Sequence, residues 1–578
     1  MVPLARYVVS ASRTPHDLNF TPSSVTLVSL ADLQVEQVTS LATALSEQPG
    51  VILYNTGAPG GQSTVSLRGA NADQTLFVVD GVRMNDRAAS YLNALGTADL
   101  TGIDRIEVLR GPQSTLYGSS AMGGVILINT AHGAGPTSGS VSATAGSFDS
   151  YGAAVEAGGA KAGFSYAGAV SRYETANERP GNDLRQWNAS LRLEDTIAAG
   201  VLVGTTMRWQ NANYEEPGSR FYAAPGTVQS ESALSTVYGE IRATDEFTSR
   251  LTLASELRQY TWLSDGYASP QSNNREILDW QNTWTPVKAA EIVAGANVES
   301  SRYVVDAGST SDHISAGYVS AILRPIATVT LTAGARYDDY HSVGSATTGR
   351  GGVAWTPVPG TKLHATYGTG FNAPSSADRY GVPDWGQLPN PTLVPEKSEG
   401  WDAGIDQELA HGALTVSATY FQNKYRNLFE WETLDPKTYD GETVNVAHAT
   451  TKGVELATAV RFSDRVQGRL AYTYLDAHDD DTGARLNRRP RHTADAEVHG
   501  MVTQAWTVGA GLHLVAANIN GTLPFGGYTT ARVFTSYALR PTLLLKLHIE
   551  NALNRHYEEV YGYPALSRGV FGSAEFRF

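Results

Sequence analysis

The chain has 578 residues, of which 42% are hydrophobic, with no cysteine and a formal net charge of -14 at pH 7. The lack of cysteine excludes a disulfide framework, and the acidic charge argues against a nucleic-acid-binding protein, which needs a basic face. The sequence contains no run of about 18 apolar residues, so a helical membrane protein is excluded too.

The first residues of the chain give two expectations. Met1 to Leu4 lack the basic and apolar regions of a signal peptide. A β-prone run follows from Ala5 to Ala11, just before the polar sequence Ser12-Arg13-Thr14-Pro15. By itself, this run fits an edge strand of the domain that comes after it.

A short helical pattern begins at Ser29. Ser29 and Asp32 are candidate caps for the start of a helix, and Pro49-Gly50 is a strong stop signal. Between them, apolar residues recur at about helical spacing: Leu33, Val38, Leu41 and Leu45. The pattern predicts one small helix in this region.

Two short apolar strands follow, and each ends in a dipeptide that suits a tight turn. The first ends at Arg68-Gly69 and the second at Asp80-Gly81, where glycine accepts the positive backbone angles of the turn. Two loops lie nearby, from Tyr54 to Gln62 and from Met84 to Leu92. The first is rich in glycine but lacks the GxxxxGK[ST] pattern and a following helix, so it does not indicate a nucleotide site.

After the linker from Ala131 to Pro136, apolar and polar residues alternate with period 2. Examples run from Val329 to Tyr337, from Leu414 to Tyr420 and from Leu543 to Ile549. A soluble sandwich would have turns every 8 to 12 residues or so. Many segments here are longer, with Tyr and Trp near their ends, as in outer-membrane barrels. At about 20 residues per strand and its loop, the rest of the chain predicts about 22 strands, and such a lumen is wide enough to need plugging.

The motifs of the first quarter, in this order, resemble the plug of TonB-dependent outer-membrane transporters. They are Ser66-Leu67-Arg68-Gly69-Ala70-Asn71, Leu76 to Asn85, Ile106 to Pro112, Tyr117-Gly118 and Gly123 to Ile126. Later motifs also resemble the family: Gly370 to Ser375, Asn390 to Leu393, Lys452 to Glu455, and Glu550 to Asn554. The last strand ends on Phe578 and resembles the signal that barrel-assembly machinery recognises.

The resemblance implies a mainly β fold in three parts. Residues 1–14 form a periplasmic segment, residues 15–132 an α+β plug, and residues 136–578 an antiparallel transmembrane β-barrel of about 22 strands. It implies the outer membrane of a Gram-negative bacterium, in contact with lipid and lipopolysaccharide. We therefore expect an exported protein whose signal peptide was replaced by a start methionine.

The resemblance also implies roles for particular residues. The segment Tyr7, Val8, Val9, Ser10 and Ala11 resembles the TonB box, which binds TonB and its inner-membrane energising complex by strand addition. The two apical loops imply a ligand site made by Asn55, Gln62, Asn85 and Tyr91. Buried charges need partners, so we expect the plug to dock on the barrel through Arg68, Arg83, Glu107 and Arg110.

Within the family, the plug spacing is nearest to that of the cobalamin transporters, from Pro49-Gly50 to Arg68-Gly69 and on to Asp80-Gly81. We therefore expect energy-coupled import of cobalamin or a related corrinoid, with ferric-siderophore uptake as the alternative. Haem is less favoured, because no histidine lies between Pro374 and Asn390. A passive porin or adhesin, a different class, would need no plug. An enzyme is not expected, because the sequence has no Gly-x-Ser-x-Gly elbow.

No covalent cofactor is expected, a catalytic zinc site has no His-Glu-x-x-His pair to support it, and calcium in the extracellular loops is the candidate metal. A calcium ion needs several oxygen ligands, but the early loops offer only Asp183, Glu215 and Glu216. A denser set, Asp476 and Asp479 to Asp481, is interpreted as a solvated hairpin loop.

Overall fold

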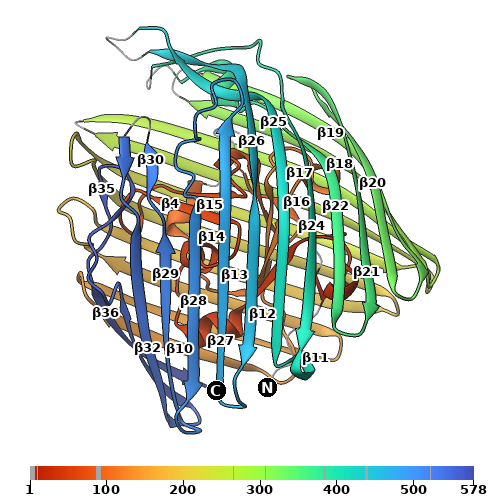
Figure 1. The fold of residues 1–578 in the computed structure, drawn as a ribbon, viewed down its shortest axis with the longest axis horizontal. Coiled ribbons are helices and arrows are strands. Elements are labelled where there is room, and N and C mark those ends of the chain that lie inside the picture. Colours follow the sequence, from red (N-terminus) through yellow and green to blue (C-terminus); the bar gives the residue numbers. More distant parts are fainter. Residues whose placement is uncertain are drawn as a thin grey trace.

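The computed structural model of the chain describes residues 7–8, 11–85, 93–264, 266–305, 308–382, 386–435, 440–520 and 523–578. The predicted coupling residues Val9 and Ser10, the side chain of Tyr7, and the predicted ligand residue Tyr91 lie outside this part. The last three quarters of the chain form a closed barrel, and the first quarter lies inside it (Figure 1).

The barrel has 22 antiparallel strands in sequence order, which confirms the predicted number. They are β10 (Ser138–Gly146), β11 (Ser150–Lys161), β12 (Phe164–Thr175), β13 (Leu184–Ala198), β14 (Val201–Gly218), β15 (Ala223–Arg242), β16 (Phe247–Ser264), β17 (Tyr267–Val287), β18 (Ala290–Val305), β19 (Gly308–Ile326), β20 (Val329–Tyr340), β21 (Gly344–Val358), β22 (Thr361–Asn372), β24 (Glu396–Leu409), β25 (Leu414–Thr433), β26 (Gly441–Arg461), β27 (Val466–Asp479), β28 (His492–Met501), β29 (Trp506–Val515), β32 (Tyr528–Arg540), β33 (Leu543–Glu550) and β36 (Gly569–Arg577). The short β23 (Gln387–Leu388) adds a parallel pairing to β26. Pairing of β10 with β36 closes the ring, so the barrel has no free edge.

The predicted alternation sets the two faces of the barrel wall. In β20, Leu331 and Tyr337 are 40% and 52% exposed on the outer face, whereas Arg336 and Asp338 are buried on the lumen side. This pattern places apolar side chains against lipid and polar ones in the interior. Among the described residues, no helix is long and apolar enough to cross a membrane.

The plug contains a five-stranded mixed sheet in the order β3-β8-β9-β6-β7. Its strands are β3 (Val25–Ser29), β6 (Thr75–Val79), β7 (Val82–Arg83), β8 (Ile103–Arg110) and β9 (Gly124–Thr130). A separate hairpin is formed by β4 (Val51–Asn55) and β5 (Ser63–Leu67), and β1 (Tyr7–Val8) pairs with β2 (His16–Asp17). Helix α3 is Ser114–Tyr117 in the plug, α4 is Ser376–Tyr380 in a barrel loop, and 3-10 turns lie at Leu18–Phe20, Ala72–Gln74, Asn93–Thr97 and Ala410–Gly412.

The single helix predicted after Ser29 is two helices, α1 (Leu30–Glu36) and α2 (Leu41–Ser46). Ser29 caps α1 as expected, because its side chain accepts the backbone N–H of Asp32. Gln37 then takes a left-handed conformation, with φ of 57°, and ends α1. Ser40 caps α2 in the same way as Ser29 caps α1, so polar caps divide the apolar pattern.

The two ends of the barrel differ in their connections. The C-terminus lies at the end with short turns, at the bottom of Figure 1. Short turns face the periplasm in barrels of this kind, so the opposite end is extracellular. The extracellular loop after β33 contains a small hairpin, β34 (Glu558–Val560) and β35 (Tyr563–Pro564), and β34 contacts β4 of the plug. The loop before β32 contains a second one, β30 (Asn518–Asn520) and β31 (Leu523–Phe525).

Candidate ligand site and plug docking

Arg68 is the most deeply buried of the three predicted docking arginines. It lies in the turn after β5 and is 1% exposed. Its guanidinium donates to Asp402 at 2.7 Å and to Glu455 at 2.8 and 2.9 Å, both on barrel strands. Burial lowers the pKa of Arg68, but these two carboxylates outweigh it and hold the pKa above its ordinary value. Arg68 therefore fastens the plug to β24 and β26.

Arg83 joins the plug to a different region of the wall. Its guanidinium pairs with Glu299 of β18, which is itself paired with Arg275 of β17. Arg275 also donates to the carbonyl oxygen of Arg83 at 2.9 Å, and Arg258 donates to that of Met84. Two barrel arginines thus hold the backbone just before the second apical loop.

The other two predicted docking residues, Arg110 and Glu107, differ in their ion pairs. The Nε of Arg110 lies 3.3 Å from Glu455, and its Nη1 donates to the carbonyl oxygen of Pro49, so Arg110 contacts both barrel and plug. Glu107 instead forms its ion pair inside the plug, with Arg105 at 3.1 Å. Residues two apart on a strand point to the same face, so the ion pair of Glu107 does not cross the interface.

The first apical loop presents two of the predicted ligand residues. Gln62 is exposed, and Asn55 is half-buried with its Nδ2 donating to Ser63 at 2.7 Å. The Oδ1 of Asn55 is buried and has no hydrogen-bond partner among the described residues. An acceptor in that state can gain a bond from a ligand.

Asn85 plays a different part from the one predicted. Its Oδ1 accepts the N–H of Phe77, and its Nδ2 donates to the carbonyl oxygen of Thr75, each at 2.9 Å. The side chain is 5% exposed, and these bonds pin it to β6. We therefore do not retain Asn85 among the ligand residues, because its amide is used by the plug backbone.

An aromatic wall, which the sequence did not reveal, lines the lumen beside the first loop. It consists of Leu184, Ala212, Tyr214 and Val228 with Tyr173, Tyr260 and Trp262 packed on them. A Cβ at Gly60 would lie 3.1 Å from that of Tyr214, so the loop rests directly on this wall. Large flat rings and a few polar groups are typical of small-molecule sites.

The segment predicted to bind TonB begins in a short ribbon that is followed by contacts with the barrel wall. Val8 is fully buried and pairs with His16 in the two-stranded β1-β2 ribbon. Beyond the turn, Arg13 donates to Asp279 at 2.9 Å and to the hydroxyl of Tyr318 at 2.6 Å. The segment is therefore held by a strand pairing at one point and a buried ion pair at the next.

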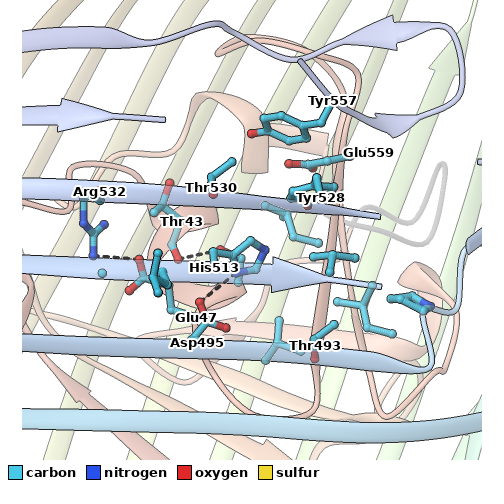
Figure 2. A pocket seen from close by; sticks show the side chains of 18 of the residues that line it. Thr43, Glu47, Thr493, Asp495, His513, Tyr528, Thr530, Arg532, Tyr557 and Glu559 are labelled. Carbon is cyan, nitrogen blue, oxygen red and sulfur yellow. Dashed lines mark hydrogen bonds and ion pairs between the residues drawn. The ribbon is translucent and has the colours of Figure 1, made fainter. Parts of the chain in front are cut away.

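A cavity of about 180 Å³ lies between α2 and β4 of the plug and strands β27 to β32 of the wall. Figure 2 shows Tyr557 and Glu559 on one side of it, with Tyr528, His513 and Asp495 facing them. His513 bonds Asp495 at 2.8 Å.

The described residues contain one candidate group for metal binding. One group of three acidic or histidine side chains has ligand atoms close enough for an ion: Glu36, Glu497 and His499. Arg469 lies 3.0 Å from Glu36 and 3.2 Å from Glu497, and Arg532 lies 3.2 Å from Glu497, so both carboxylates already have arginine partners. The acidic side chains of the extracellular loops form no such group in the described part, and calcium there stays a prediction.

Both parts of the chain match known protein families. Residues 17–125 match the TonB-dependent Receptor Plug Domain, and residues 129–552 match the TonB dependent receptor-like, beta-barrel family. The chain belongs to the TonB-dependent receptor family. This receptor is therefore an outer-membrane protein of Gram-negative type, in a family of transporters and receptors rather than enzymes.

Curated relatives resemble the receptor over its whole length. It is 27% identical to the Vitamin B12 transporter BtuB of Photobacterium profundum, with 99% of this chain and 95% of the relative covered. It is 25% identical to the BtuB of Vibrio vulnificus with the same coverage.

Solved structures share the fold of the receptor at lower identity. The ferric yersiniabactin uptake receptor FyuA from Yersinia pestis is 19% identical, covers both chains completely and has a TM-score of 0.79. The ferripyoverdine receptor of Pseudomonas aeruginosa is 16% identical, with a TM-score of 0.84 and coverage of 99% of this chain and 88% of that one. At this identity the likeness establishes the architecture alone.

Proposed function

We propose that this receptor imports cobalamin or a related corrinoid across the outer membrane with energy from TonB. The observation that carries the proposal is the similarity to curated vitamin B12 transporters over 99% of the chain and 95% of the relative. A match of this extent includes the plug and the loops, where recognition resides.

The chemistry of the extracellular site supports the same ligand. A corrinoid is bulky and carries many amide groups around a flat ring. Asn55 and Gln62 offer neutral amides from the plug, and the aromatic wall with Tyr260 and Trp262 offers flat apolar surface. Neutral hydrogen bonds with a stacking face suit such a molecule.

TonB coupling is proposed to act through Tyr7, Val8, Val9, Ser10 and Ala11. Strand addition takes its affinity from main-chain hydrogen bonds. The pairing of Tyr7–Val8 with His16–Asp17 supports the proposal, because it indicates that this backbone is suited to strand geometry. A strand of TonB would take the place of His16–Asp17 in this pairing.

Ferric-siderophore uptake is the second candidate. It is favoured by the high TM-scores to siderophore receptors, although their identity to this chain is below 20%. A passive porin is a poorer candidate, since the plug fills the lumen.

The test is ligand binding by the purified, detergent-solubilised receptor. The chain has 10 tryptophans, so we expect saturable quenching of its fluorescence by cyanocobalamin and none by ferric catecholate or hydroxamate chelates. Alanine at both Asn55 and Gln62 should weaken the binding, and Arg426→Ala, at an exposed ion pair, should not. Quenching by a ferric chelate alone would overturn the corrinoid assignment.

A further inference from the structure

The hairpin of residues 558–564, here called the lid hairpin, lies on the first apical loop of the plug. The carboxylate of Glu559 accepts the backbone N–H of Asn55 at 2.9 Å. A Cβ at Gly57 would lie 2.6 Å from the carbonyl oxygen of Pro564, so no space separates the two segments. Val560 packs in one cluster with Ile52 of the plug. The hairpin therefore covers part of the surface that the proposed ligand must reach.

The lid hairpin is also fastened to a neighbouring extracellular loop, the turn between β14 and β15. The backbone N–H of Arg220 donates to the carbonyl oxygen of Gly562 at 2.8 Å, and its guanidinium lies 3.2 Å from Glu558. The ring of Phe221 stacks on Tyr561 with centroids 5.0 Å apart.

These fastenings are weak enough to be released. Arg220 is half exposed and Phe221 is 61% exposed. Exposed ion pairs contribute little, and an isolated two-stranded hairpin is marginally stable in water. The contact of Glu559 with Asn55 is buried by comparison. The contacts at the rim of the hairpin are therefore exposed and weak, whereas the buried contact of Glu559 with Asn55 holds its inner end.

The space beneath the lid hairpin is too small for a bulky nutrient. Tyr557 and Glu559 border the cavity of about 180 Å³ (Figure 2). The ring of Tyr528 stacks on that of Tyr557, with the ring centroids 4.2 Å apart. Ligand sites for drug-sized molecules span about 300 to 1,000 Å³. The unpartnered Oδ1 of Asn55 lies on the same plug residue that the hairpin holds.

We propose that residues 558–564 act as a lid over the plug side of the ligand site, and that entry of a bulky polar nutrient requires this lid to lift from Asn55. Lifting would free the backbone N–H of Asn55, expose its unpartnered Oδ1 and enlarge the cavity. The inference deepens the proposed function and rests on it only for the identity of the ligand.

The first test needs no ligand. The natural chain has no cysteine, so Asn55→Cys reports access beneath the lid, and Gln62→Cys, exposed on the same loop, is its matched control. A bulky, charged maleimide is added to each, with and without the pair Arg220→Gln and Phe221→Ala. Loss of one exposed ion pair and one aromatic pair is expected to speed labelling at position 55 about tenfold. Labelling at position 62 should stay within about twofold.

A second loosening variant guards against misfolding. Glu559→Ala removes the acceptor of the backbone N–H of residue 55, and Arg426→Gln removes an exposed ion pair outside the lid hairpin. We expect faster labelling of Asn55→Cys with the first and no change with the second. Equal labelling of Asn55→Cys in the unmodified and loosened proteins would overturn the lid.

A cross-link that holds the lid closed tests the proposal in the opposite direction. In the pair Arg220→Cys and Glu558→Cys, a short bis-maleimide should abolish quenching by cyanocobalamin, and the untreated pair should retain it. Retained quenching after complete cross-linking would also overturn the proposal. If the natural receptor shows no quenching, the corrinoid assignment fails, and the labelling arm still decides whether the lid exists.

Discussion

Arg68 has two roles, because its backbone forms part of a turn and its side chain forms ion pairs with the barrel. Its φ of 52° and that of 80° at Gly69 form the turn after β5, and the guanidinium reaches two barrel carboxylates. A positive φ is uncommon for a residue other than glycine. It persists here because the ion pairs and the ring of Phe421, 4.7 Å from the guanidinium, hold the side chain in place.

Replacing Arg68 by alanine should loosen the plug strongly. Asp402 and Glu455 would be left buried without their main partner, which costs about 3 to 5 kcal/mol. The measurement is the urea concentration at which protease first cuts the plug, and it should fall well below that of the natural receptor. Arg426→Ala removes a pair that is 60% exposed on the arginine side and should shift it little. Equal shifts for both variants would contradict the docking role.

The pH dependence of the lid should follow Glu559. Burial raises the pKa of this carboxyl from 4.5 to about 7, against the influence of His513 and the N–H of Asn55. The closed lid therefore binds a proton more tightly than an open one, and closure weakens as pH rises from about 4.5 to about 7, then stays level. The other titratable groups around Glu559 are Tyr54 from β4, Asp495 from β28, Tyr528 from β32, and Tyr557 and Glu558 beside it.

The measurement is labelling of Asn55→Cys divided by that of Gln62→Cys at each pH. The ratio should rise across that window and level off above it, and Glu559→Gln should make it flat. A flat ratio with Glu559 present would show that this carboxyl does not govern the lid.

At the scale of elements, the β1-β2 ribbon and the lid hairpin are short strand pairs that can give up their present contacts for others. The ribbon of β1 and β2 has two residue pairs, and the lid hairpin also has two. Two-stranded ribbons of this length are marginal by themselves. Strands of the barrel, in contrast, share a ladder that closes on itself. Changes of state are therefore expected in the plug segment and the lid.

Proline at Val9 should uncouple transport from binding. It removes one backbone donor and fixes φ, so strand addition to TonB loses affinity and uptake should fall to background. Alanine at Val9 keeps the donor and should cost far less. Uptake and outer-surface binding are measured on the same cells. Full uptake by the proline variant would show that this segment is not the coupling strand.

At the scale of the whole molecule, the barrel encloses the plug and fixes it at many points of its wall. Arg68 reaches β24 and β26, Arg83 reaches β18, and Asp80 pairs with Arg192 of β13. The cavity and the lid hairpin lie together beside β28 to β32. The proposed lid therefore lies on a frame that many contacts between plug and barrel hold in place.

The unheated receptor should migrate faster on gels than the boiled one. A closed ladder has no edge at which to open, so detergent alone leaves it compact. Circular dichroism of the same sample should be dominated by β structure. Identical migration before and after boiling would argue against closure.

The sequence by itself determined the plug and barrel order, the strand count and the docking arginines. Period-2 alternation and turn dipeptides are local signals, and a buried arginine must find a carboxylate wherever it lies. The division of one helix at Gln37 was also local but was hidden by the apolar spacing.

Only the tertiary structure decided which carboxylates meet which arginines, that Asn85 serves β6, and that Glu559 lies on Asn55. The last contact joins residues 504 positions apart. Which loops contact each other across a barrel depends on the register of every strand between them. No local sequence pattern predicts that cumulative register.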